Sequence, residues 1–187
     1  MARKTTRKRA GTTALVIIDM MNTLDFPEGP RLAKRATPAA RRIARLKTRF
    51  VSRGLPVVYA NDNFGAWHMD FRELVDACAQ GPGRALVEAL RPDDTDYYVL
   101  KPRHSVFFET PLRMLLAQLR VSRVVLCGVA TDACVLASAI DAHMHGYVTF
   151  VPSDCVQAET TPRNAGALRL MRVSFQVDTT ESTRLRL

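Results

Sequence analysis

The sequence predicts one three-layer α/β/α domain built around a parallel sheet. Apolar runs of strand length alternate with longer segments of helical period, a pattern typical of βαβ units whose sheet is buried on both faces. A chain of 187 residues with 47% hydrophobic residues is long enough to bury the core of a single domain. We therefore expect one domain over residues 12–187, preceded by a basic disordered tail over residues 1–11.

The predicted strands and helices follow one another along the chain. The apolar runs predict strands at residues 13–19, 56–60, 96–101, 123–128, 147–151 and 174–178. The first helix is predicted to begin near Pro38. It continues through Ile43, Leu46 and Phe50, whose spacing puts them on one face, and Gly54 stops it. Further helices are predicted at residues 70–78, 84–90, 111–120, 132–145 and 162–172.

The basic charge lies mostly at the N-terminal end of a chain whose formal net charge is +9. Five basic residues lie in the first ten, and nine more lie between Glu28 and Asp62, where no acidic residue occurs. We interpret them as a tail and one solvated helix face. Because no nucleic-acid motif is present, we expect no specific nucleic-acid partner and only nonspecific adhesion.

The cysteines and the apolar runs indicate whether the protein binds zinc and in which compartment it lies. Cys78, Cys127, Cys134 and Cys155 form no C-x-x-C pair and no metal-type spacing, so they are predicted to be free thiols without zinc. No run reaches the length of a membrane span, and the first ten residues lack the apolar stretch of a signal peptide. We expect a cytoplasmic protein with no membrane partner.

Three reactive side chains end or follow three predicted strands. Asp19 ends the first, Lys101 ends the third, and Cys134 follows the fourth by one short turn. Alone, Asp19 is compatible with a turn cap, Lys101 with a solvated strand end and Cys134 with the core. Ligands of open parallel sheets bind beyond the carboxyl ends of the strands. An acid, a cation and a thiol at that edge are the set that thiol catalysis requires.

The segment before Cys134 predicts a stabilised thiolate. Thr131 is a good N-cap, which makes Cys134 the third helical residue, within the first turn where free N–H groups and the helix dipole favour an anion. Lys101 is expected to lower the pKa of the thiol further. Asp19 is expected to accept the thiol proton and later deliver it to a leaving group.

With these residues in place, the chain resembles the isochorismatase-like cysteine hydrolases. The resemblance rests on "LVIIDMMN" with Asp19, "LKPRHSVF" with Lys101 and "CGVATDACV" with Cys134, and it extends over about residues 12–178. It implies an Asp-Lys-Cys catalytic triad and a six-stranded sheet in the order 3-2-1-4-5-6. It also implies a cis peptide between Val129 and Ala130, and an oxyanion hole formed by the N–H groups of Ala130 and Cys134.

Two features help to choose among the chemistries of that superfamily. Isochorismatases that hydrolyse a vinyl ether typically lack the cysteine, so Cys134 favours attack on a carbonyl. Nicotinamidases carry a metal site with an Asp-x-His motif after the second strand, where this chain has Asp62, Asn63 and Phe64. The missing histidine disfavours a nicotinamidase, and we expect no metal and no cofactor.

The substrate pocket and the assembly are predicted more coarsely. Trp67, the single tryptophan, lies on a predicted loop, where it would cover either a ligand or a neighbouring subunit. The resemblance implies a homo-oligomer, a dimer or a tetramer. The predicted pocket residues are Asn22, Leu24, Asn63, Phe64, Trp67, His104, Thr131 and Val135.

These observations lead to one preferred function and three alternatives. The preferred one is a cysteine-dependent hydrolase that cleaves an amide, ureide or carbamoyl C–N bond of a small molecule through a thioester. One alternative is a noncatalytic binding or scaffold protein whose basic tail contacts nucleic acid. The others are a vinyl-ether hydrolase of the isochorismate type and a redox sensor that uses Cys134.

Overall fold

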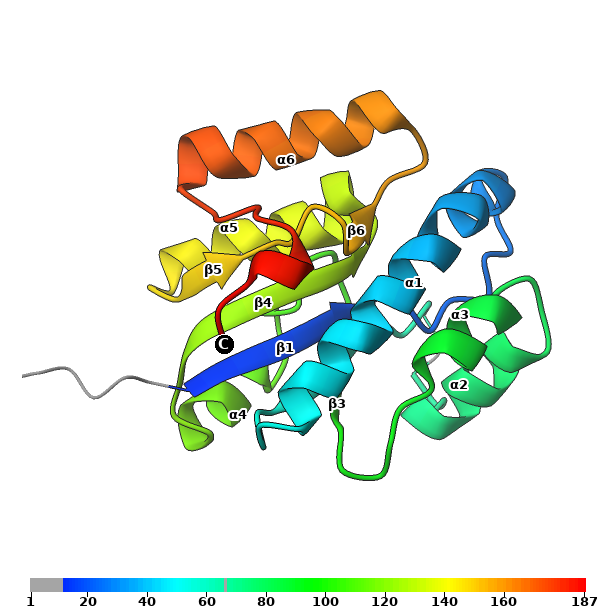
Figure 1. Cartoon of the computed structure of the whole chain (residues 1–187). Helices are drawn as coiled ribbons and strands as arrows, with labels where there is room; N and C mark the ends of the chain where they lie inside the picture. Colours follow the sequence, from blue (N-terminus) through cyan, green and yellow to red (C-terminus); the bar gives the residue numbers. More distant parts are fainter. Residues whose placement is uncertain (1–11, 66) are drawn as a thin grey trace, which may run out of the picture.

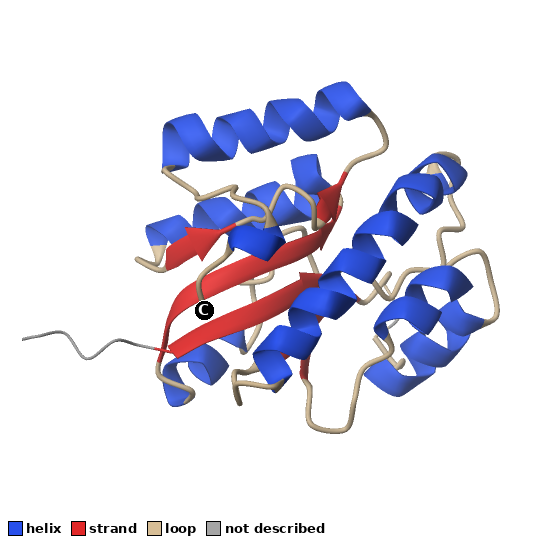
Figure 2. Cartoon of the chain, in the orientation of Figure 1, coloured by secondary structure: helices blue, strands red, loops and turns tan. Residues whose placement is uncertain are grey.

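A computed structural model describes residues 12–65 and 67–187 and contains the predicted parallel sheet between two layers of helices (Figures 1 and 2). The predicted tail, residues 1–11, lies outside the described residues. Within the described ranges, no helix combines the length and the apolar character needed to cross a membrane.

The sheet has six parallel strands in the order β3-β2-β1-β4-β5, and β6 pairs with the far end of β4. This confirms the predicted fold class. The strands are β1 (Thr12–Ile18), β2 (Val57–Asp62), β3 (Tyr97–Lys101), β4 (Val121–Val129), β5 (Val148–Phe150) and β6 (Val156–Gln157).

β1 and β4 form the centre of the sheet, and their ends approach each other closely. Both strands are almost entirely buried, as their continuous apolar sequences predict. Gly128 lies opposite Ile18 with a φ of 121°, and a Cβ atom there would lie 2.0 Å from the carbonyl oxygen of Ile18. Only glycine fits this position. It brings the chain after β1 and the chain after β4 to the same point of the sheet edge.

The helices divide between the two faces of the sheet. One apolar cluster packs α1, α2 and α3 against residues such as Leu15 and Ile17, and the other packs α4, α5 and α6 against residues such as Val16 and Ile18. The alternation follows from the opposite directions of successive strand side chains. The helices are α1 (Gly29–Val51), α2 (Phe71–Ala79), α3 (Arg84–Leu90), α4 (Leu112–Gln118), α5 (Leu136–Met144) and α6 (Thr161–Phe175).

The sixth strand was predicted at the wrong residues. Instead of forming a strand at 174–178, the chain continues α6 to Phe175, and Gln176 then adopts a left-handed conformation with a φ of 54°. Asp178 makes only an isolated bridge with Phe150 of β5. The apolar residues near 175 belong to the end of this helix rather than to a strand.

The first helix begins earlier than predicted. It starts at Gly29, with Pro30 in its first turn, where a missing N–H costs nothing. Pro38 lies inside the helix, where it removes one backbone hydrogen bond. Ala36, Ala39 and Ala40 are buried around this proline, so the packed face of the helix continues through it.

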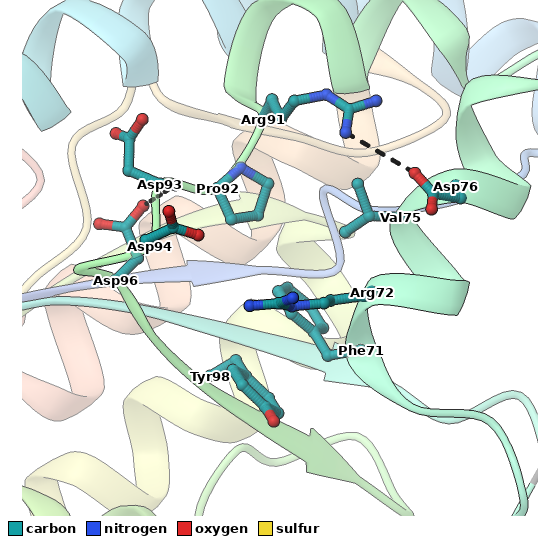
Figure 3. A pocket seen from close by; sticks show the side chains of 10 residues that line it. All are labelled: Phe71, Arg72, Val75, Asp76, Arg91, Pro92, Asp93, Asp94, Asp96 and Tyr98. Atoms are coloured by element: carbon teal, nitrogen blue, oxygen red, sulfur yellow. Dashed lines mark hydrogen bonds and ion pairs between the residues drawn. The ribbon is translucent and has the colours of Figure 1, made fainter.

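The basic residues of α1 were predicted to form one solvated face, and this is wrong for Lys47. Lys47 is 7% exposed, and its Nζ atom lies 2.8 Å from Oδ2 of Asp93 and 2.5 Å from Oδ2 of Asp96. Both aspartates line a cavity of about 240 Å³ between α2 and the start of β3 (Figure 3). In the same cavity, Arg91 forms an ion pair with Asp76 at 3.6 Å.

Candidate active site

Asp19 follows β1 directly and is held by the end of β2. Its residue is 5% exposed, and its φ of 51° lies in the left-handed region, which aspartate tolerates better than most residues. The Asp19 N–H donates to the carbonyl oxygen of Ala60 at 3.0 Å. The N–H of Asp62 donates to Oδ1 of Asp19 at 2.7 Å. These two contacts with β2 leave Oδ2 directed at another partner.

That partner is Lys101, which is completely buried at the end of β3. Its Nζ atom lies 2.9 Å from Oδ2 of Asp19. Two strand spacings, roughly 10 Å, separate β3 from β1. The long lysine side chain spans this distance across the end of β2, where Lys101 is in register with Asp62. The Nζ atom also donates to the carbonyl oxygen of Arg103 at 3.2 Å.

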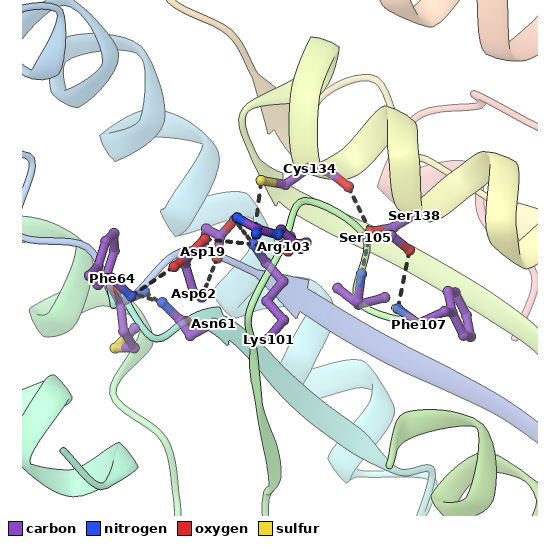
Figure 4. A network of polar contacts seen from close by, with 12 residues as sticks. Asp19, Asn61, Asp62, Phe64, Lys101, Arg103, Ser105, Phe107, Cys134 and Ser138 are labelled. Carbon is purple, nitrogen blue, oxygen red and sulfur yellow. Dashed lines mark hydrogen bonds and ion pairs between the residues drawn. The ribbon is translucent and has the colours of Figure 1, made fainter. Parts of the chain in front are cut away.

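Cys134 completes the cluster from the other side. Its Sγ atom lies 3.4 Å from Nζ of Lys101 (Figure 4), and the Asp19 carboxylate is near enough to raise the pKa of the thiol. The structure thus brings Asp19, Lys101 and Cys134 together as predicted. The peptide between Val129 and Ala130 is cis, which confirms another expectation from the resemblance.

The local structure around Cys134 differs from the predicted N-terminal helical turn. Residues Thr131–Val135 form a short π-helical turn that leads into α5. Thr131 is not the N-cap, because the N-cap position belongs to Ala130 and no side chain caps the turn. The Thr131 side chain is buried, and its hydroxyl donates to Oδ1 of Asn164 in α6.

The expected stabilised thiolate is wrong for the resting protein. Burial and the negative charge of Asp19 raise the pKa of Cys134 to about 12, and they outweigh the favourable effect of Lys101. Burial also raises the pKa of Asp19 above its ordinary value of 3.8, although Lys101 opposes this shift. Burial lowers the pKa of Lys101, but Asp19, Cys134 and Asp62 together raise it above its ordinary value. At neutral pH the thiol of Cys134 is therefore protonated and lies beside the ammonium group of Lys101.

Several positioning residues escaped the sequence analysis. The Ser138 hydroxyl donates to the carbonyl oxygen of Cys134 at 2.6 Å and accepts from the N–H of Val106 at 3.1 Å. It ties the helix that carries Cys134 to the loop after Lys101. On the other side, Arg163 of α6 forms an ion pair with Asp132 at 2.5 Å. No local pattern in the sequence marks these pairs, because their members lie about 30 residues apart.

Asp62 is a second carboxylate beside Lys101. Its Oδ2 atom lies 3.5 Å from Nζ of Lys101, and its Oδ1 atom accepts from the N–H of Phe64 at 2.7 Å. Both carboxylate oxygens of Asp62 are thus engaged by groups within the protein. Across the described ranges, no three His, Cys, Asp or Glu side chains gather in an arrangement that could hold a metal ion.

A cavity of about 600 Å³ opens beside Asp62. Three of the predicted pocket residues line it: Asn63, Trp67 and His104. Trp67 is 76% exposed, so it neither packs into the core nor covers the cavity in the isolated chain. Sequence reasoning missed six further lining residues, which are Asp62, Gly65, Pro102, Arg103, Phe108 and Glu109.

The other predicted pocket residues lie elsewhere, and their contact with substrate stays a prediction. Phe64 is exposed and points away from Cys134 in Figure 4. Leu24 and Val135 are buried in the two apolar clusters. Asn22 is 8% exposed, and its Oδ1 atom accepts from the N–H of Leu24 at 2.8 Å. These contacts give Asn22 a role in shaping the turn after β1.

Comparison with known proteins identifies the family of this chain. The sequence matches the isochorismatase domain over residues 13–182, which is most of the chain. The chain belongs to the isochorismatase family. An uncharacterized member of the isochorismatase family from Bacillus subtilis is 36% identical over 169 residues, covering 90% of this chain and 93% of its own. Maleamate amidohydrolase of Pseudomonas putida is 32% identical over 151 residues, covering 76% of this chain and 71% of its own.

Solved structures of the isochorismatase family share the fold. An isochorismatase family protein from Desulfovibrio vulgaris superposes with a TM-score of 0.76 at 24% identity, covering 92% of this chain and 95% of its own. N-carbamoylsarcosine amidase from Thermoplasma acidophilum superposes with a TM-score of 0.71 at 27% identity, covering 94% of this chain and 99% of its own. The chain is accordingly an isochorismatase-family hydrolase.

Proposed function

We propose that this isochorismatase-family protein hydrolyses the C–N bond of a small amide, ureide or carbamoyl compound through a thioester on Cys134. The observation that carries the proposal is the buried Lys101 ammonium group, which lies 2.9 Å from a carboxylate oxygen of Asp19 and 3.4 Å from Sγ of Cys134. A thiol, a proton acceptor and a cation in mutual contact are the groups that thiol-based acyl transfer needs.

Proton transfer from Cys134 to Asp19 begins the reaction. With the Cys134 pKa at about 12, very little thiolate is present at rest, so the thiol loses its proton as it attacks the carbonyl. The raised pKa of Asp19 makes this carboxylate a better proton acceptor than an exposed aspartate. Lys101 stays charged and offsets the negative charge that passes between the two groups.

Attack forms a bond between Sγ of Cys134 and the carbonyl carbon, and the electron pair moves to the oxygen. The N–H groups of Ala130 and Cys134 are the proposed donors to this oxyanion. The C–N bond then breaks, and Asp19 returns its proton to the departing nitrogen. Water next attacks the thioester and gives a proton to Asp19, which passes it to the sulfur, so the acid product leaves and the thiol is restored.

The names of two similar proteins support a C–N bond as the target. One is a maleamate amidohydrolase and the other is an N-carbamoylsarcosine amidase. We further propose that the enzyme needs no metal and no cofactor, since Asp62 is engaged by Lys101 and Phe64 stands at the expected histidine position. Assembly into a dimer or a tetramer stays a prediction.

A substrate screen with a trapping step tests the proposal. Small amides, ureides and carbamoyl compounds are incubated with the full chain, and ammonia release is measured. Mass spectrometry after rapid acid quench should find an acyl group on Cys134. Cys78→Ala serves as the matched control, because Cys78 is a free cysteine on the buried face of α2. Ammonia release that persists in Cys134→Ala would refute the thioester mechanism.

A further inference from the structure

The cavity beside the catalytic cluster contains a cation that the proposed mechanism does not use. Arg103 lines this cavity of about 600 Å³, and its residue is exposed. Its guanidinium group forms no ion pair and no hydrogen bond with any residue in the ranges 12–65 and 67–187. An arginine fork presents its donors in the geometry that a carboxylate accepts.

The backbone of Arg103 is held at a fixed position relative to the reacting groups. Its carbonyl oxygen accepts from Nζ of Lys101 at 3.2 Å, and the same Nζ atom lies 3.4 Å from Sγ of Cys134. Pro102 restricts the chain between the two residues. Figure 4 shows Arg103 beside Lys101. The arginine side chain therefore starts at the point where a substrate bound to Cys134 would extend into the cavity.

The other charged groups of the cavity leave Arg103 available. Asp62 is engaged by Lys101 and by the N–H of Phe64, and Glu109 is exposed and makes no ion pair with a described residue. The cavity between α2 and β3 is different, because there Arg91 is paired with Asp76 at 3.6 Å. Trp67 and Phe108 also line the cavity that contains Arg103.

The geometry points to Arg103 as the binding group for a substrate carboxylate, so that the substrate class is a small amide or ureide that also carries a carboxylate. This inference rests on the proposed function, because it takes Cys134 as the group that the substrate reaches. The free carboxylate binds the guanidinium group, and the scissile carbonyl is thereby presented to Cys134. The guanidinium group can form two parallel hydrogen bonds with such a carboxylate, which fixes the orientation of the substrate.

Two alkylating reagents of nearly the same shape test the carboxylate site without a known substrate. Iodoacetate carries a carboxylate, whereas iodoacetamide carries a neutral amide in its place. The rate of Cys134 modification by each reagent is measured by mass spectrometry of the full chain at physiological ionic strength. Each rate is divided by the rate with N-acetylcysteine amide, which removes the intrinsic difference between the reagents.

The expected result is a normalised preference for iodoacetate that depends on Arg103. Arg103→Gln should lower the ratio of iodoacetate to iodoacetamide rates by about tenfold, a difference of about 1.4 kcal/mol. Arg103→Lys should retain part of the preference, because it keeps the charge and loses the fork. Arg72→Gln is the matched control, since Arg72 is exposed in the other cavity and its removal changes the net charge equally.

The outcomes separate this inference from the proposed function. A ratio that is equal in the wild type and in Arg103→Gln, with Cys134 modified in both, would overturn the carboxylate site and leave the nucleophile in place. An equal fall of the ratio in Arg72→Gln would also overturn it, because the effect would then be long-range charge. Failure of both reagents to modify Cys134 in the wild type, where Arg103 should hold iodoacetate beside the thiol, would overturn the carboxylate site, whereas the nucleophile is tested by the acyl trapping described under the proposed function.

Discussion

Two buried lysines of this protein have nearly the same partners and very different surroundings. Lys47 lies between Asp93 and Asp96 at 2.8 and 2.5 Å, and Lys101 lies between Asp19 and Asp62 at 2.9 and 3.5 Å. In both places the lysine residue is less than one tenth exposed. Each ammonium group is thus removed from water and stabilised by two carboxylates.

The two clusters differ in what lies next to the ion pair. Lys47 lies 5.3 Å from the ring centre of Tyr59, whose pKa is raised to about 12 mainly by burial, and whose hydroxyl donates to a backbone carbonyl. Lys101 lies beside a thiol, at the strand ends, next to a cavity. A buried ion pair alone therefore does not mark an active site. The reactive third group and the access to it make the difference.

The largest expected effect comes from removing that third group. Cys134→Ala should lower turnover by at least about 10⁴-fold, because no other group of the cluster can form the thioester. Circular dichroism and the thermal midpoint should change little, since Cys134 is only partly buried. If turnover of a well-folded Cys134→Ala protein stayed within tenfold of the wild type, Lys101 would have to be regarded as a structural lysine like Lys47.

The second expected effect is a loss of stability when Lys47 is replaced. Lys47→Met leaves Asp96, whose side chain is 4% exposed, buried without its cation, and this should cost about 3 to 5 kcal/mol of unfolding free energy. Urea denaturation measures the loss. Turnover per folded molecule should stay at the wild-type value, because Lys47 contacts neither the Cys134 thiol nor the cavity of about 600 Å³ beside Asp62.

A double variant provides the control for the Lys47 prediction. Lys47→Met combined with Asp96→Asn removes the uncompensated charge and should recover a large part of the lost stability. No recovery would mean that the lysine stabilises the fold through packing of its carbon chain on Tyr59 rather than through its charge.

This comparison also explains how much the sequence could predict. Asp19, Lys101 and Cys134 were recognisable because each lies at a strand end, and parallel strand ends meet at one edge. Lys47 was misinterpreted as part of a solvated face because its partners, Asp93 and Asp96, lie more than 40 residues away in a loop. Helical periodicity shows which face a residue occupies, but it does not show what packs on that face.

The charge state of Cys134 was missed for a related reason. The sequence shows a helix start and a nearby lysine, which both favour a thiolate. It does not show that the thiol is partly removed from water or that Asp19 lies next to it, and these two effects dominate the pKa. The prediction of a sixth strand at residues 174–178 failed for a different reason, because an apolar stretch near residue 175 fits a strand and a helix end equally well.

The third expected effect compares one aspartate from each lysine cluster. Asp19→Asn keeps the shape but removes the proton acceptor, so turnover should fall by at least about 10²-fold. Asp96→Asn makes the same chemical change beside Lys47 and should lower stability while leaving turnover per folded molecule intact. Both variants are assayed for turnover and thermal midpoint on the same preparations. Equal loss of turnover in the two would contradict the special role of Asp19.

The smallest expected effect concerns the pH dependence that Asp19 confers. As the pH rises, turnover should increase, whereas the contribution of Asp19 to the unfolding free energy should decrease. Burial raises the pKa of Asp19 above 3.8, so the folded state binds this proton more tightly than the unfolded chain does. Between 3.8 and the raised pKa, the folded state therefore carries more protons, and the contribution of Asp19 to the unfolding free energy falls as the pH rises. Turnover should increase over the same range, because the carboxylate must be ionised to accept the thiol proton.

Subtracting the unfolding free energy of Asp19→Asn from that of the wild type at each pH isolates the contribution of Asp19 from that of the other carboxylates. A difference that rises with pH, in parallel with turnover, would mean that Lys101 outweighs burial at Asp19 and that the Asp19 cluster behaves as an ordinary buried ion pair.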